Sequence, residues 1–284
     1  MPSMPIRLLA VDLDGTLLNS RSEVSPANRQ ALGRAASGGV EVAIVTGRRF
    51  HSALPFIKQL DCTVTVISSN GARIGKLDGE VCYRNFLRAA LAREALRTAP
   101  EARRYAVVMY DIAERGQVIM QNGASPEGPI AWYRRTAPDA LLEVADLEAA
   151  ISLDQPDPIQ VMFGGPPPEI EPLEPLLAAS PISSHVHLTW TKYPLRSTVI
   201  LDVLTQGCTK GSALRLWAAQ QGIAANEVMA IGDNHNDGEM LEFAGRPVVM
   251  ANAEPGVCRD GWAVTLSNDE DGVAAAVERY VLRS

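Results

Sequence analysis

Two carboxylates, Asp12 and Asp14, end an apolar run that begins at Leu8. A continuous run of this kind is typical of a strand that is buried on both faces of a parallel sheet. An ionised aspartate there needs a partner, and a divalent cation is one, because hard cations bind carboxylate and carbonyl oxygens. The carboxyl end of a strand is also where an open α/β sheet binds ligands. Asp12 and Asp14 could equally be turn residues beside Gly15, and this run alone leaves both interpretations open.

Two further segments place polar groups at the start of a predicted helix. Thr46 and Gly47 follow the apolar run 41–45. A hydroxyl with free backbone N–H groups at a helix N-terminus suits phosphate, although an N-cap threonine with a turn glycine explains the pair as well. Lys210 opens another helix, where a cation is unfavourable unless an anion lies nearby. A solvated surface lysine is the simpler alternative, and the segment lacks the GxxxxGK motif of a nucleotide P-loop.

A fourth segment, 232–237, has the composition of a turn, but Asp233 follows a buried apolar run just as Asp12 does. The same segment also carries Asn236 and Asp237. In a parallel sheet, the carboxyl ends of neighbouring strands meet at one edge. The four segments together therefore predict a polar site at that edge, although turn or capping chemistry explains each of them alone.

Other catalytic chemistries find little support. His185 and His187 alternate on a predicted strand and share one face without a carboxylate motif beside them, so we interpret them as structural or solvated. His235 lies in the loop after a buried strand, where a polar turn residue is a simpler interpretation than a substrate contact. The sequence has neither the GxSxG motif of a serine hydrolase nor the GxGxxG motif of a dinucleotide site.

Alternating strands and helices must position these residues. Up to about Gly79, and again after residue 193, the pattern predicts βαβ units and a parallel sheet. Ser25 and Pro26 are expected to begin the first helix, as its N-cap and its first helical residue. The expected strands of this core are 7–12, 41–45, 63–67, 198–203, 228–231, 247–250 and 263–266, and its helices are 27–36, 51–59, 211–221, 239–243 and 272–281.

Residues 85–190 differ in pattern and are expected to form an α+β domain inserted into a core of residues 1–84 and 191–284. The stretch 125–138 is expected to be irregular, and Pro166–Pro168 to be a surface turn. Helices are expected over 86–98, 147–151 and 172–179, and strands over 105–110, 117–121, 159–163 and 186–190. The predicted fold class is α/β, a Rossmann-like parallel-sheet core with an inserted α+β domain.

Composition limits which binding partners and which cellular compartments fit the protein. Hydrophobic residues make up 46% and charged residues 21% of the 284, which is typical of soluble globular proteins. The net charge of −7 provides no basic field for nucleic acid or acidic lipid, and no apolar run is long enough to span a membrane. The four cysteines are scattered, which favours a reducing compartment over a disulfide framework. Residues 1–5 lack the features of a signal peptide, so a cytoplasmic location is expected.

The four segments resemble the motifs of the haloacid dehalogenase superfamily, specifically its Cof-type phosphatases with a large type IIB cap. The resemblance covers the full length of the chain, and no catalytic position departs from the family pattern. In chain order the motifs are Asp12-Leu13-Asp14-Gly15-Thr16-Leu17-Leu18, Thr46-Gly47-Arg48, Lys210-Gly211 and Gly232-Asp233-Asn234-His235-Asn236-Asp237. The stretches 69–72 and 268–273 are also similar to this group.

The resemblance implies a role for each of these residues. Asp12 would be the nucleophile that attacks phosphorus and forms an aspartyl-phosphate. Asp14 would protonate the leaving oxygen and then deprotonate the hydrolytic water. One Mg²⁺ would be held by Asp12, by the main-chain carbonyl of Asp14 and by Asp233. Arg48 would support this site.

The resemblance also implies a set of groups that bind the phosphoryl oxygens. These would be the Thr46 hydroxyl, the Gly47 amide and the Lys210 ammonium. All three would stabilise the negative charge on the phosphoryl oxygens during transfer. Asn236 would contact the phosphate as well. Asp237 would orient Lys210 or the groups around the metal.

The activity implied by the resemblance is Mg²⁺-dependent hydrolysis of a small phosphorylated metabolite. The inserted domain would be a cap that closes over the site, excludes water and selects the substrate. Residues 85–190 contain eight arginines, no lysine and fourteen acidic residues, which favours a compact monophosphate such as a sugar phosphate. A phosphomutase of the phosphomannomutase type is the alternative enzyme, and a non-catalytic phosphometabolite sensor is the alternative from another class. No nucleic-acid or membrane partner is expected, and the oligomeric state is left open.

Overall fold

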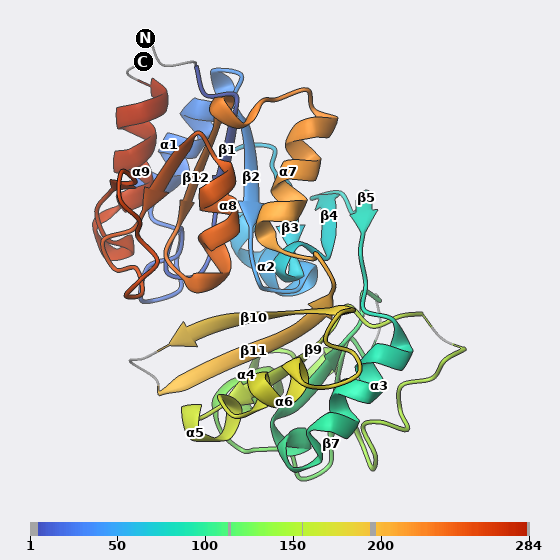
Figure 1. Ribbon diagram of the computed structural model, residues 1–284. Helices are drawn as coiled ribbons and strands as arrows, with labels where there is room; N and C mark the ends of the chain where they lie inside the picture. The colour runs from blue at the N-terminus through green and yellow to red at the C-terminus, as the bar shows by residue number, and fades with distance from the viewer. Residues whose placement is uncertain (1–4, 113–114, 155, 194–196, 283–284) are drawn as a thin grey trace. The chain divides into compact units, whose positions relative to one another are not determined.

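The computed structural model describes residues 5–112, 115–154, 156–193 and 197–282 (Figure 1). The expectation that the chain lacks a signal peptide rests on residues 1–5, and residues 1–4 lie outside the described residues. The chain divides into two compact units. The core unit comprises the chain up to Arg84 and from Thr209 onward, and the inserted unit comprises Asn85–Cys208.

A mixed sheet forms the middle of the core unit. Within the described residues it has eight strands, in the order β14-β13-β12-β1-β2-β3-β4-β5. The strands from β14 to β3 are parallel, which confirms the predicted core, and β4 and β5 are antiparallel additions at one edge. The bounds are β1 Leu8–Val11, β2 Glu41–Val45, β3 Thr65–Ser68, β4 Arg73–Lys76, β5 Val81–Arg84, β12 Val228–Gly232, β13 Arg246–Val249 and β14 Ala263–Val264.

Helices cover both faces of this sheet (Figure 1). One face carries α1 (Pro26–Ser37), α2 (Phe50–Ile57) and α9 (Gly272–Val277), and the other carries α7 (Lys210–Gln220) and α8 (Gly238–Phe243). Successive side chains of a strand point to opposite faces, so β1 contributes Leu9 and Val11 to one core and Leu8 and Ala10 to the other. All four side chains are fully buried, which explains the uninterrupted apolar run before Asp12.

Local capping fixes where two of these helices begin. The Ser25 side chain accepts a hydrogen bond from the Asn28 backbone N–H at 3.1 Å, and Pro26 is the first residue of α1, as predicted. At the start of α7, the Thr209 hydroxyl accepts a hydrogen bond from the Ser212 backbone N–H at 2.9 Å. This capping interaction, with Ser212 bonding back to Thr209, places Lys210 in the first turn of the helix.

The inserted unit is built on a second sheet. In the part of the chain that the structure describes, this sheet has six strands in the order β10-β11-β9-β6-β7-β8, antiparallel except between β7 and β8. Its hydrophobic core packs Val161 and Phe163 of β9 against Leu96 of α3 and Leu177 of α6. The bounds are β6 Ala106–Met109, β7 Val118–Gln121, β8 Leu141–Val144, β9 Gln160–Gly165, β10 Val186–Tyr193, β11 Thr198–Thr205, α3 Ala89–Thr98, α4 Gly128–Thr136, α5 Pro167–Ile170 and α6 Leu173–Ala178.

The expected domain boundary at residue 190 is wrong. The strand expected over 198–203 within the core is β11, and it pairs antiparallel with β10 and with β9. The inserted unit therefore ends at Cys208. An apolar run predicts a strand but does not identify the sheet that the strand joins, so residues 191–208 belong to the inserted unit and not to the core.

Three local expectations for the inserted unit are also wrong. The stretch 125–138 contains the helix α4, which begins with Pro129 near its first position, where proline is favourable. Residues 147–151 form turns rather than a helix. Pro166–Pro168 leads into the short helix α5 instead of a surface turn. Proline fits both a turn and a first helical turn, so the prolines within 125–138 and 166–168 do not distinguish between the two.

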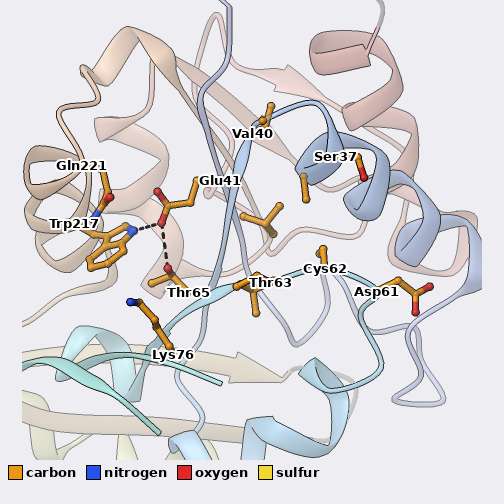
Figure 2. Close-up of a pocket in the computed structure, with 14 residues that line it drawn as sticks. Ser37, Val40, Glu41, Asp61, Cys62, Thr63, Thr65, Lys76, Trp217 and Gln221 are labelled. Carbon is orange, nitrogen blue, oxygen red and sulfur yellow. Dashed lines mark hydrogen bonds between the residues drawn. The ribbon is translucent and has the colours of Figure 1, made fainter. Parts of the chain in front are cut away.

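A pocket of about 590 Å³ lies in the core unit at the amino ends of β2 and β3 (Figure 2). Glu41 in this pocket accepts hydrogen bonds from the Trp217 indole N–H at 2.5 Å and from the Thr65 hydroxyl at 3.1 Å. Lys76, at the same pocket, forms an ion pair with Glu80. Since the central strands are parallel, this pocket lies at the end of the sheet opposite to Asp12, and its charged groups already have protein partners.

Among the helices that the structure describes, none has both the length and the apolar character needed to cross a bilayer. The cytoplasmic location stays a prediction.

Candidate active site

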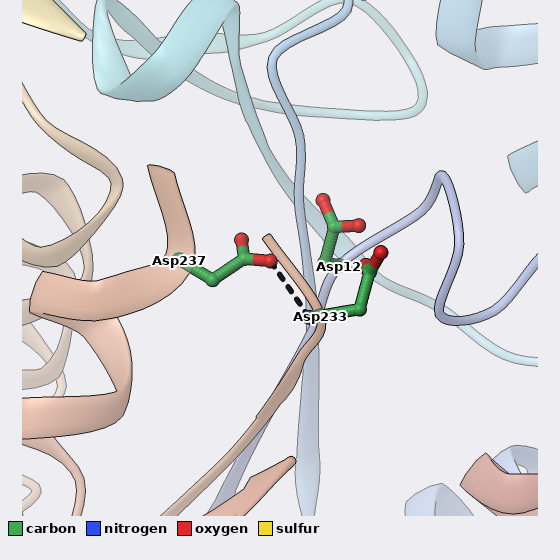
Figure 3. Close-up of side chains that lie close together, drawn as sticks. All are labelled: Asp12, Asp233 and Asp237. Atoms are coloured by element: carbon green, nitrogen blue, oxygen red, sulfur yellow. Dashed lines mark hydrogen bonds between the residues drawn. The ribbon is translucent and has the colours of Figure 1, made fainter. Parts of the chain in front are cut away.

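The four predicted segments meet at the carboxyl edge of the core sheet. Asp12 directly follows β1, Asp233 directly follows β12, and Thr46 directly follows β2. Because β1 is hydrogen-bonded in parallel to both β2 and β12, the carboxyl ends of these three strands are neighbours. Lys210 joins them from the first turn of α7. Figure 3 shows the side chains of Asp12 and Asp233 close to that of Asp237.

The Lys210 ammonium group lies between two buried carboxylates. Its Nζ donates hydrogen bonds to Asp12 Oδ1 and to Asp237 Oδ1, each at 2.6 Å. Burial alone would lower the pKa of Lys210, but the two carboxylates outweigh burial and hold this pKa above its ordinary value. A charged lysine at the start of a helix is therefore explained by the anions beside it.

Asp237 uses both of its carboxylate oxygens within the protein. While Oδ1 accepts from Lys210, Oδ2 accepts from the backbone N–H of Asp233 at 2.9 Å (Figure 3). Oδ2 also accepts from the backbone N–H of Asn234 at 3.0 Å. The side chain is completely buried. Asp237 therefore fixes the position of Lys210 and the backbone of the loop that carries Asp233.

A close approach between two motifs explains the glycine after Asp14. A Cβ atom at Gly15 would lie only 2.2 Å from Asp233 Oδ2, and the φ angle of Gly15 is +80°, a region that favours glycine. The next residue, Thr16, donates a hydrogen bond from its hydroxyl to Asp233 Oδ1 at 2.7 Å. The Thr16 hydroxyl of the first motif thus holds the Asp233 carboxylate. Gly15 leaves the space that this close approach needs.

The carboxylates of Asp12, Asp233 and Asp237 have oxygens within 4.8 Å of one another, and Lys210 supplies a single positive charge among them. Burial raises the pKa of Asp12 to about 7, and burial together with the Asp12 charge raises the pKa of Asp233 well above its ordinary value. This excess of buried negative charge fits a divalent cation. Since Oδ1 of Asp12 and Oδ1 of Asp233 accept from Lys210 and Thr16, their Oδ2 atoms are the best placed to bind one.

The side chain of Asp14 has a different environment from that of Asp12. It accepts two hydrogen bonds from Arg48, from Nε to Oδ2 at 2.6 Å and from Nη2 to Oδ1 at 2.5 Å. The Asp14 side chain is 30% exposed, whereas the Asp12 side chain is 5% exposed. Arg48 is itself held over the ring of Phe56, with its guanidinium carbon 4.5 Å from the ring centre. Two aspartates that are two residues apart are therefore equipped for different tasks.

The second motif forms the neighbouring wall of the site. The Thr46 hydroxyl accepts a hydrogen bond from the Arg48 backbone N–H at 3.1 Å, and Thr46 is buried. Asn236 donates a hydrogen bond from Nδ2 to Asn70 Oδ1 at 3.0 Å, beside Gly47. The structure thus brings together all the predicted site residues. It adds Asn70, which the sequence motifs contain but to which they assign no role.

Comparison with known proteins identifies the family. A family model described as haloacid dehalogenase-like hydrolase matches residues 9–277. The chain belongs to the haloacid dehalogenase-like hydrolases. The family and the enzyme class expected from the motifs are thereby confirmed, as is the α/β fold class.

Similar proteins cover nearly all of this hydrolase. The phosphatase YwpJ of Bacillus subtilis is 30% identical over 95% of this chain and 98% of its own length. The HMP-PP phosphatase of Serratia proteamaculans is 32% identical over 88% of this chain and 85% of its own length. A crystal structure of a haloacid dehalogenase-like hydrolase from Bacteroides thetaiotaomicron is 29% identical and superposes with a TM-score of 0.79, covering 96% of this chain and 99% of that one.

Proposed function

We propose that this hydrolase is a Mg²⁺-dependent phosphomonoesterase that acts on a small phosphorylated metabolite through an aspartyl-phosphate on Asp12. The observation that carries the proposal is the pairing of buried Asp12 with Lys210 beside Asp233, while the Asp14 carboxylate is held apart by Arg48. The names of two similar proteins, a phosphatase and an HMP-PP phosphatase, support the reaction class.

In the first step, an Asp12 carboxylate oxygen attacks phosphorus and the bond from phosphorus to the leaving oxygen breaks. Asp14, protonated once an oxygen is released from Arg48, donates its proton to the leaving oxygen. In the second step, a water molecule attacks phosphorus and gives a proton to Asp14, and the bond between phosphorus and Asp12 breaks. Phosphate departs, and both aspartates return to their starting states.

The remaining residues hold the phosphoryl group and the metal. Thr46, the Gly47 amide, Lys210 and Asn236 would bind the phosphoryl oxygens, and a positive charge held at Lys210 stabilises the charge that develops there. Bound Mg²⁺ supplies additional positive charge to the phosphoryl oxygens. Asp12, Asp233 and the main-chain carbonyl of Asp14 would hold the ion, since both oxygens of Asp237 accept hydrogen bonds already.

The direct test is hydrolysis of p-nitrophenyl phosphate with Mg²⁺ and after removal of metal with EDTA. Turnover is expected with Mg²⁺, and its loss in EDTA is expected to be reversed by added Mg²⁺. Full turnover by the metal-free protein would rule out the proposed mechanism. Transfer of phosphate from one position to another on a sugar, without release of phosphate to water, would identify a phosphomutase instead.

Asp14→Asn is expected to lower kcat by about 10²–10⁴-fold, because an amide cannot transfer the proton. The loss should be larger for an alkyl phosphate, whose leaving oxygen needs the proton, than for p-nitrophenyl phosphate, whose leaving phenolate is stable. Mg²⁺ should still raise the melting temperature of the variant, because the side chain of Asp14 pairs with Arg48 rather than facing the metal cluster. Equal losses of kcat/KM on the two substrates would remove the role of Asp14 as the general acid of the first step.

The stability of the metal-free protein is expected to fall as pH rises from about 4 to 7. The pKa of Asp12 is raised by burial from its ordinary 3.8 to about 7 in the folded protein, so over this range the folded state binds more protons than the unfolded chain. Mg²⁺ binds the ionised carboxylates and should therefore raise the melting temperature more at pH 8 than at pH 5. Thermal unfolding with and without Mg²⁺ at these two pH values measures the difference. An Asp233→Asn control should lose most of the Mg²⁺ response, and an equal Mg²⁺ effect at both pH values would contradict the prediction.

The substrate is proposed to be the monophosphate of a neutral, polyhydroxylated compound such as a sugar, with the inserted unit acting as the cap. Within its corrected bounds, 85–208, the inserted unit has ten basic and fifteen acidic residues. Several of its arginines already form ion pairs: Arg93, Arg97 and Arg103 with Glu148, and Arg134 with Glu143. A screen of phosphorylated sugars, nucleotides and cofactors, ranked by kcat/KM, tests this, and a preference for diphosphates would contradict it.

A further inference from the structure

The turn after β3 has an unusual backbone. Ser69 and Asn70 have φ angles of 51° and 52°, and Gly71 follows with a φ of 100°. The left-handed region is unfavourable for residues that carry a Cβ atom, with asparagine among the most tolerant of them. Two such residues in succession persist only where the surroundings fix them, and such strain is frequent at functional sites.

Backbone hydrogen bonds fix this turn against the second motif. The Ser69 N–H donates to the Arg48 carbonyl at 2.8 Å, and the Asn70 N–H donates to the Thr46 carbonyl at 3.1 Å. The left-handed conformation is what lets two successive N–H groups reach two carbonyls of the same segment. The turn therefore braces the residues on both sides of Gly47, whose amide is proposed to bind phosphate.

The Asn70 side chain connects the second motif to the fourth. It is 1% exposed, and its Oδ1 accepts the hydrogen bond from Asn236 Nδ2 at 3.0 Å. A Cβ atom at Gly47 would lie 3.1 Å from Asn70 Oδ1 and 3.5 Å from Asn236 Nδ2. Both carboxamides thus pack against the Gly47 backbone, and a side chain at Gly47 would push them away.

The far end of the Asn236 carboxamide lacks a protein partner within the described part of the chain. Its Oδ1 is buried and accepts no hydrogen bond there. A half-turn of both carboxamides preserves the Asn70–Asn236 hydrogen bond, with Asn70 Nδ2 as the donor and Asn236 Oδ1 as the acceptor. It places Asn236 Nδ2, as a donor, where the unpartnered Oδ1 now lies. A donor next to the Gly47 amide suits a phosphoryl oxygen.

We propose that Asn70 is a positioning residue of the phosphate site, which acts through Asn236 by aiming the outer end of the Asn236 carboxamide at a phosphoryl oxygen beside Gly47. The strained turn is the means by which Asn70 reaches that place. This inference rests on the proposed phosphatase function, because it refines the same site.

A double-mutant cycle on Asn70 and Asn236 tests the inference. Asn70→Gly fits the left-handed backbone and removes only the carboxamide, and Asn236→Ala removes its partner. Each single variant is expected to weaken the inhibition by inorganic phosphate at least about tenfold, as for the loss of one hydrogen bond to a charged group. Because Asn70 acts through Asn236, the double variant should bind phosphate no more weakly than Asn236→Ala alone.

Controls separate positioning from a structural role. Asn226→Gly makes the same substitution at an exposed asparagine just before β12, at the amino end of the sheet, and it should leave phosphate inhibition unchanged. Asn70→Asp keeps the size of the side chain but places a negative charge near the phosphate, so it should weaken inhibition more than Asn70→Gly. Unchanged phosphate inhibition in Asn70→Gly, or effects of the two single variants that multiply in the double variant, would overturn the inference.

Calorimetric binding of inorganic phosphate to the full-length protein in Mg²⁺ provides a readout that does not depend on turnover. A wild-type protein without phosphatase activity would refute the proposed function, whatever the Asn70 variants show. A wild-type protein with activity, whose phosphate affinity does not change in Asn70→Gly, would refute only the role of Asn70.

Discussion

Asp12→Asn is expected to lower the turnover of p-nitrophenyl phosphate by at least about a thousandfold, because an amide is a far weaker nucleophile than the carboxylate. The metal-free variant should nonetheless melt at a temperature no lower than that of the wild type at pH 8. The wild-type protein must keep a buried carboxylate ionised there, although burial raises its pKa to about 7, and the neutral amide does not carry that cost.

The two measurements together separate a lost nucleophile from a damaged fold. Asp61→Asn is a matched control, because Asp61 carries the same chemical change on a side chain that is 70% exposed. It should leave both turnover and melting temperature unchanged. Turnover by Asp12→Asn within tenfold of the wild-type rate would show that Asp12 is not the nucleophile.

Among the substitutions considered, Lys210→Met is expected to lower the free energy of unfolding the most. Asp12 and Asp237 would lose the buried cation that both of them bind, and breaking a buried ion pair by removing one partner costs about 3–5 kcal/mol of the free energy of unfolding. Methionine keeps much of the length and the apolar stem, so the loss reports the charge rather than a cavity. Urea unfolding at pH 8 without metal measures it.

The pH and metal dependence of this loss identify its cause. Protonation of Asp12 at pH 5 should reduce the loss, and added Mg²⁺ at pH 8 should restore part of the stability by replacing the missing positive charge. Lys58→Met, which removes an exposed lysine at the end of α2, should change the free energy of unfolding by no more than about 0.5 kcal/mol. A loss of similar size in Lys58→Met, or one that does not depend on pH, would contradict the electrostatic explanation.

The candidate site could be predicted from sequence where it depends on strand ends. Asp12, Thr46 and Asp233 each follow an apolar run, and parallel pairing of β1 with β2 and β12 is enough to bring them together. Lys210 could be predicted because a cation at a helix start needs an anion. What these residues share is a position that follows from backbone topology alone.

The pairing of side chains could not be predicted in the same way. The ion pair between Asp14 and Arg48 depends on the directions of two side chains 34 residues apart, and on the Phe56 ring that supports the arginine. Asn70 has its contact to Asn236 because a left-handed turn points it there, and polar residues before a glycine do not specify that both Ser69 and Asn70 take left-handed φ angles. Similarly, nothing in the apolar run of β11 shows that this strand joins the second sheet rather than the first.

The arrangement of the sheet also determines the order in which the chain can become structured during synthesis. β1, near the N-terminus, lies between β2 and β12, and its partner β12 leaves the ribosome about two hundred residues later. The inserted unit is continuous in sequence and has its own hydrophobic core, so we expect it to fold first and to bring the flanking segments closer together. Until β12 arrives, one edge of β1 stays unpaired, and the nascent chain depends on protection from aggregation during that interval.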